Sequence, residues 1–225
     1  MVATVSSPRP VVVAVASDGS EAAVRYGAAE AVRSGGTLHV VHVVDLVPWR
    51  EPHVLGVTER AARKAEVVLW DAVSYARSLV ADAVDVTSEL YHGEVVAGLV
   101  EVGAEGRLLV LERRASGPHS DVPERAVCTK VSAAARGPVV CVPSEWRGVD
   151  GPVVVGVDSP ETCHPALLAG LEAAAARRTS LRILHARWLA REEDHPDHLP
   201  SNDTATTETT IREIVRSFVD SSAAL

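Results

Sequence analysis

The first 142 residues alternate between short apolar runs and longer amphipathic stretches. Residues 11–17 read VVVAVAS, a continuous β-branched run that is typical of a parallel strand covered on both faces. From Ser20 onward the apolar residues are spaced by three and four, which predicts a helix that ends at Gly35 and Gly36. The same alternation predicts further strands at 38–44, 84–91, 108–111 and 139–142, and further helices at 58–80, 95–102 and 124–135.

Five strand and helix alternations in residues 10–142 predict an α/β domain with a doubly wound, parallel five-stranded sheet. Right-handed crossovers place the helices on both faces of such a sheet. The loops that follow the strands then lie together at one edge, where ligands of open α/β sheets bind.

The opening pattern occurs a second time in the chain. Residues 10–43 form a strand, loop, helix and strand that are echoed at 152–186, and both copies end in a hydrophobic residue next to histidine. The segment 143–151 (PSEWRGVDG) has the composition of a linker. Counterparts of the last three strands are missing from 152–225, which we therefore interpret as a partial, truncated second copy.

Composition and charge narrow the class of protein. Of 225 residues, 47% are apolar, enough for a substantial core. The formal charge of −8 would repel nucleic acid and anionic membranes, and no apolar run approaches the roughly 20 residues of a membrane helix. Three cysteines without a CxxC spacing favour a reducing cytosol, so we expect a cytoplasmic protein.

Three stretches resemble the universal stress protein family in its tandem actinobacterial-type form. They are VVVAVASDGSEAA at 11–23, HVVHV at 39–43 and AVCTKVSAAARGPVVCVP at 126–143. The resemblance covers the whole first copy and the front half of the second. It implies the strand order 3-2-1-4-5, with a ligand site where the order reverses between the first and fourth strands.

Many members of that family bind ATP through a Gly-x2-Gly-x9-Gly-Ser/Thr loop. The corresponding positions here are Glu112, Ala115, Arg125 and Ala126, so none of them matches. A carboxylate roughly 4 Å from a phosphate is repelled by about 4 kcal/mol at an intermediate dielectric. Residues 121–124 also have the spacing of a capping box, whose carboxylates would take the helix donors that a phosphate needs. We therefore predict that the usual ATP-binding loop is lost.

An alternative is that the loop binds an anion through side chains. Arg113, Arg114 and Arg125 could hold a phosphate in place of backbone amides, giving an ATP- or AMP-binding sensor or a slow ATPase. By resemblance, Asp18 would receive the ribose or adenine and Val43 would flank the base. Asp18 could equally cap the first helix.

Other candidate chemistry is weaker. His195 and His198, with Asp194, have enough donors for a metal, but a polar loop explains them more simply, so we predict no metal site. His39 and His42 are interpreted as sheet residues. No serine lies in a GxSxG nucleophile elbow, so no catalytic residue is assigned.

The sequence thus predicts a non-enzymatic regulatory or interaction module of the stress response, with an unidentified regulatory protein as partner. Family members commonly dimerise through the fifth strand. The resemblance therefore predicts a homodimer, formed here through an apolar edge strand. Its residues are Val139, Val140, Cys141 and Val142.

Overall fold

A computed structural model describes residues 9–17, 19–44, 55–113, 124–148, 151–157 and 163–185, together with a few positions between 209 and 216. Within these ranges, side chains are described except at 55–59 and 124–126. The chain divides into two compact units, Met1–Gly148 and Val149–Leu225, which are treated separately below.

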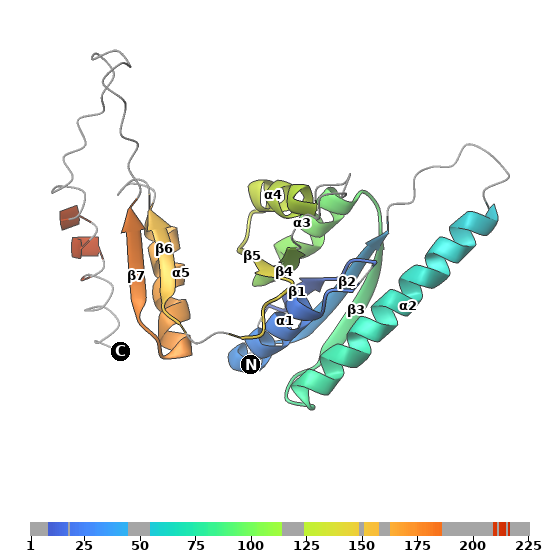
Figure 1. The fold of residues 1–225 in the computed structure, drawn as a ribbon, viewed down its shortest axis with the longest axis horizontal. Coiled ribbons are helices and arrows are strands. Elements are labelled where there is room, and N and C mark those ends of the chain that lie inside the picture. Colours follow the sequence, from blue (N-terminus) through green and yellow to red (C-terminus); the bar gives the residue numbers. More distant parts are fainter. Residues whose placement is uncertain are drawn as a thin grey trace, which may run out of the picture. The chain divides into compact units, whose positions relative to one another are not determined.

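The first unit contains a five-stranded parallel sheet in the order β3-β2-β1-β4-β5 (Figure 1). The predicted fold class and strand order are therefore confirmed. β1 is buried along its whole length, as its continuous apolar run predicts. The strands are β1 (Val11–Ala14), β2 (Leu38–Val44), β3 (Val86–His92), β4 (Leu108–Arg113) and β5 (Val139–Pro143).

Four helices cover the two faces of this sheet (Figure 1). They are α1 (Glu21–Ser34), α2 (Leu55–Val80), α3 (Val95–Glu105) and α4 (Glu124–Ala134). Val11 and Val13 of β1 pack in one core cluster with α1 and α2, whereas Val12 and Ala14 pack in another with α3 and α4. This division follows from the alternation of side chains along a strand.

The ends of several elements differ from the predicted ones. β1 ends at Ala14 and not at residue 17, because the chain turns there: the Ala16 amide donates to Ser20 Oγ (3.0 Å) and the Gly19 amide to the Ala16 carbonyl (3.1 Å). β4 continues to Arg113 because its last residues pair with β5. α2 begins at Leu55, earlier than predicted, and α3 ends later, at Glu105.

α1 packs directly on the sheet because residue 27 is glycine. A Cβ atom at Gly27 would lie 2.2 Å from Val13 Cγ2, well inside any permissible contact. The absence of a side chain therefore fixes how closely the helix backbone approaches β1.

The same contact occurs in the second unit. Its described part has a two-stranded parallel sheet, β6 (Val153–Val157) and β7 (Leu181–His185), connected by α5 (His164–Arg177). A Cβ atom at Gly170 would lie 2.2 Å from Val155 Cγ2. The packing of α1 on β1 is thus repeated by α5 on β6, as the repeated sequence pattern at 10–43 and 152–186 predicts. Between residues 209 and 216 only isolated positions are described; Ile214, one of them, packs against the β6 and α5 cluster.

Both α1 and α5 end in a left-handed residue that closes the helix, but the residues differ. Gly35 (φ 64°) caps α1, and Arg178 (φ 51°) caps α5. A residue with a Cβ atom is disfavoured in this conformation by about 1 kcal/mol or more.

We predict that Arg178→Gly stabilises α5 by about 1 kcal/mol, since glycine adopts the left-handed cap without steric penalty. Hydrogen exchange of the α5 amides in the full chain measures this effect, which should appear as slower exchange. Arg177→Gly, one residue earlier and inside the helix, is the matched control and should speed exchange instead. Unchanged protection in Arg178→Gly would show that the left-handed cap carries no strain.

β5 lies at an edge of the five-stranded sheet, and its backbone directions can be assigned. The Pro138 carbonyl and the Ser144 amide bond to β4, so the residues between them alternate in direction. Val140 and Val142 then direct their amides to β4, and Val139 and Cys141 direct theirs outward. Pro143 has no amide to offer, which limits strand addition to the first part of the edge.

We propose that a second copy of the chain pairs with this outward edge. Val139→Pro should then convert a dimer at tens of micromolar to monomer, because it removes an outward amide and leaves the bonds to β4 intact. Light scattering measures the change. Ser88→Pro, at an outward position of the opposite edge strand β3, is the matched control and should leave the dimer unchanged. A wild-type monomer, or a dimer that survives Val139→Pro, would rule out this edge.

Candidate functional site

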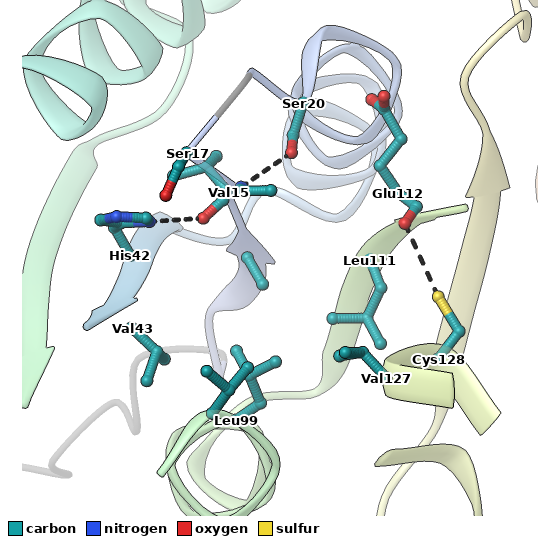
Figure 2. Close-up of a pocket in the computed structure, with 13 residues that line it drawn as sticks. Val15, Ser17, Ser20, His42, Val43, Leu99, Leu111, Glu112, Val127 and Cys128 are labelled. Carbon is teal, nitrogen blue, oxygen red and sulfur yellow. Dashed lines mark hydrogen bonds between the residues drawn. The ribbon is translucent and has the colours of Figure 1, made fainter. Parts of the chain in front are cut away.

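A pocket of about 230 Å³ opens at the carboxyl ends of β1, β2 and β4, where the strand order reverses (Figure 2). Its floor is mainly aliphatic, and its polar groups are few. The lining residues are Ala14, Val15, Ala16, Ser17, Ser20, His42, Val43, Val95, Leu99, Leu111, Glu112, Val127 and Cys128. The pocket therefore lies where the sheet topology predicts a ligand site.

The turn after β1 uses Ser20 to close itself. Ser20 Oγ accepts from the Ala16 amide (3.0 Å; Figure 2). It also donates to the Gly19 carbonyl (2.6 Å). Ser20 occupies the N-cap position of α1, but its side chain makes no hydrogen bond to the first turn of the helix. The first amides of α1 consequently need another acceptor.

Glu112 supplies that acceptor from the end of β4. Its Oε2 accepts hydrogen bonds from the amides of Ala22 (2.9 Å) and Ala23 (3.3 Å). A carboxylate at a helix N-terminus is stabilised both by these bonds and by the helix dipole. Glu112 is therefore a tertiary cap, which the sheet order permits because β4 lies next to β1.

The sequence analysis placed capping carboxylates at the helix after β4. Residues 121–123 lie outside the described residues, and so does the side chain of Glu124. The predicted capping of this helix therefore stays a prediction.

α3, which also borders the pocket through Val95 and Leu99, is capped in a similar way. Glu94 accepts from the amides of Ala97 (2.7 Å) and Val96 (3.0 Å), and these two bonds lower the pKa of its carboxyl. Two of the helices that border the pocket are therefore capped by glutamates of the chain itself.

His42 is a pocket residue that the sequence analysis missed. It is buried, and its Nδ1 donates to the Val15 carbonyl (2.7 Å), which fixes the ring across the ends of β1 and β2 (Figure 2). With Nδ1 as the donor, Nε2 of the neutral ring is an acceptor. The sequence feature that could have indicated this role is the position of His42 near the carboxyl end of β2. His39 points to the opposite face, where it contacts Thr87 Oγ1 (2.8 Å).

Of the predicted site residues, Val43 lines the pocket. Arg113 ends β4 with an exposed side chain and does not line it. Asp18 and Arg114 lie outside the described residues, and so does the side chain of Arg125. The structure therefore brings Val43 together with His42 and Glu112, and leaves the arginine-based anion site without a test.

In the described part of the chain, no group of three or more His, Cys, Asp or Glu residues could hold a metal ion, and Asp194, His195 and His198 lie outside that part. Among the helices so described, none combines the length and apolar character needed to cross a bilayer.

Comparison with known proteins identifies the fold and the family. The model of the universal stress protein family matches residues 8–143. Universal stress proteins of Mycobacterium tuberculosis and Mycobacterium bovis are 28% identical over 137 residues, which are 60% of this chain and 42% of theirs. The chain thus matches less than half the length of these relatives.

Two solved structures support the fold. A universal stress protein from Archaeoglobus fulgidus superimposes with a TM-score of 0.61 at 14% identity, over 92% of this chain and 72% of that one. The universal stress protein UspA from Lactobacillus plantarum gives 0.51 at 21% identity, over 60% of this chain and 99% of that one.

We predict that Glu112→Ala lowers the free energy of unfolding of the first unit by about 1–2 kcal/mol, because two α1 amides lose their acceptor. Glu112→Gln should lower it less, since the amide oxygen can still accept. Urea denaturation measures both, and amide exchange at Ala22 and Ala23 locates the effect. Glu105→Ala, an exposed glutamate near the end of α3, is the control and should stay within about 0.5 kcal/mol of wild type. Equal stability of Glu112→Ala and wild type would refute the cap.

Proposed function

Because the chain belongs to the universal stress protein family, we propose that it acts as a regulatory or interaction module of the stress response whose pocket does not hold ATP in the usual way of the family. The observation that carries this proposal is the position of the Glu112 carboxylate. It lies at the α1 N-terminus, within hydrogen-bond distance of two amides, in the wall of the pocket at the switch point.

The charge of Glu112 opposes a polyphosphate in this pocket. By resemblance, position 112 is the first glycine of the phosphate loop, where backbone amides approach the ligand closely. Two like charges roughly 4 Å apart repel by about 4 kcal/mol at an intermediate dielectric, enough to weaken binding by several hundredfold or more. The amides of Ala22 and Ala23, which could otherwise turn toward an anion, are already bonded.

Two further polar groups of the pocket are also engaged within the chain. His42 Nδ1 bonds to the Val15 carbonyl, and Ser20 Oγ bonds within its own turn. What the pocket presents is an aliphatic floor, to which Leu99, Leu111 and Val127 contribute. Such a lining suits a small ligand with a large apolar part better than a highly charged one.

We also propose that the module is not an enzyme. Ser20 directs its hydroxyl proton to the Gly19 carbonyl and not to His42, and Cys128 donates its proton to the Glu112 carbonyl (3.6 Å). In neither case is a nucleophile hydrogen-bonded to a general base, as nucleophilic catalysis would require. We expect the protein in the cytoplasm, where its three thiols would remain reduced.

A second candidate function is favoured by Val43. This residue lines the pocket at the end of β2, where the family resemblance places a group that flanks an adenine base. An adenine-nucleotide sensor or slow ATPase would then use Arg113, Arg114 and Arg125 to hold the phosphates of ATP or AMP. Calorimetry distinguishes it from the first proposal.

We predict that the wild-type chain gives no binding heat with ATP or AMP up to millimolar concentration, because Glu112 repels the phosphates. Isothermal titration calorimetry measures this directly. Glu112→Gln keeps the shape of the side chain and removes its charge, and should bind ATP more tightly than wild type. Glu105→Ala again serves as the control.

A micromolar dissociation constant for wild type would overturn the proposal. If that binding were then lost in Arg125→Ala, the arginine-based sensor would be the correct function.

A further inference from the structure

Two of the three cysteines belong to one core cluster at the side of the pocket. Cys128 is on α4 and lines the pocket, and Cys141 is on the neighbouring strand β5. Both belong to the core cluster between the sheet and the α3 and α4 layer, in which Cys128 is buried and Cys141 is partly buried. No disulfide joins them or involves Cys163.

Two hydrogen-bond contacts locate the thiols relative to each other. Cys141 Sγ lies 3.8 Å from the hydroxyl of Ser132, which is one helical turn after Cys128 and hence on the same face of α4. Cys128 Sγ donates to the Glu112 carbonyl (3.6 Å), and Glu112 follows Leu111, the β4 residue that pairs with Cys141. The two side chains thus meet in the core cluster between α4 and the β4–β5 pair.

The environments of the two thiols differ. Burial is the main cause, and the neighbouring Cys141 a smaller one, of a rise in the pKa of Cys128 to about 12. Cys128 therefore keeps its proton at neutral pH and is a poor first target for an oxidant. Cys141 is only partly buried, and strand pairing at the β5 edge uses its backbone and not its side chain, so it is the more accessible of the two thiols.

We propose that Cys128 and Cys141 are a reversible oxidation site, which a peroxide converts to a disulfide in the wall of the pocket. This site does not depend on whether the pocket binds a nucleotide. It makes the chain a direct target of oxidative stress.

The reaction is balanced with one molecule of hydrogen peroxide. The Cys141 sulfur attacks one peroxide oxygen, the O–O bond breaks, and water leaves as Cys141 becomes a sulfenic acid. The Cys128 sulfur then attacks Cys141 Sγ, forming the S–S bond and breaking the S–O bond. The hydroxyl leaves as a second water and takes the Cys128 proton. A dithiol reductant reverses the reaction.

Oxidation changes the pocket through Glu112. The disulfide removes the S–H group that Cys128 donates to the Glu112 carbonyl, and it draws the Cys128 side chain toward β5. The S–S bond of a disulfide is about 2.05 Å long, much shorter than the distance between two thiols in contact. The parts of α4 and β5 that carry the two cysteines must therefore move closer together. The structural change caused by oxidation therefore occurs next to Glu112, the residue that caps α1.

Peptide mapping of the full chain tests the proposal. The chain is treated with an equimolar amount of hydrogen peroxide, its remaining thiols are alkylated, and it is digested with trypsin. Cleavage after Arg125, Lys130, Arg136 and Arg147 places the two cysteines in separate peptides, 126–130 and 137–147. We expect a linked pair of these peptides that disappears on reduction.

Cys163→Ala is the matched control and should give the same linked pair, whereas Cys128→Ala and Cys141→Ala should abolish it. If a variant does not fold, the presence or absence of the linked peptides in the wild-type chain still tests the proposal. The proposal is overturned if oxidation gives a sulfinic acid at Cys141 with Cys128 still open to alkylation. A link between Cys141 residues of two chains, or a link to Cys163, overturns it equally.

Discussion

The close contact between α1 and β1 at Gly27 sets the position of the helix that Glu112 caps. Because residue 27 has no side chain, the helix backbone lies directly against Val13 in the middle of β1. This contact fixes the position of the α1 N-terminus beside the end of β4, within reach of a single glutamate side chain. A bulkier residue at 27 would lift the helix and separate Glu112 from the amides that it caps.

From that position follows the electrostatic character of the site. Parallel strands direct their carboxyl ends, and helix N-termini, to one edge of the sheet, which ordinarily attracts anions. In this chain Glu112 and Glu94 place carboxylates at two of these N-termini, one at α1 and one at α3. The partial positive charges at these two N-termini are thus balanced within the chain, and the pocket beside them is mainly aliphatic.

The sequence predicted the features that depend on local periodicity. β-branched apolar runs predicted the strands, spacing by three and four predicted the helices, and the family resemblance predicted their order. What could not be predicted depends on contacts between distant elements. Nothing near Glu112 in the sequence indicates that it caps a helix ninety residues earlier. Likewise, a histidine in a strand shows its role only once the end of β1 is known to lie beside it, as it does for His42.

Glu112 also affects how the stability of the first unit is linked to its surroundings. A helix whose N-terminus is capped by a bound anion gains stability in proportion to the logarithm of the ligand concentration. The stability of such a helix therefore depends on how much of that ligand is present. A carboxylate tethered to the adjacent strand is present at a constant local concentration. The stability that this carboxylate gives the α1 N-terminus is therefore built into the chain and does not require a dissolved anion.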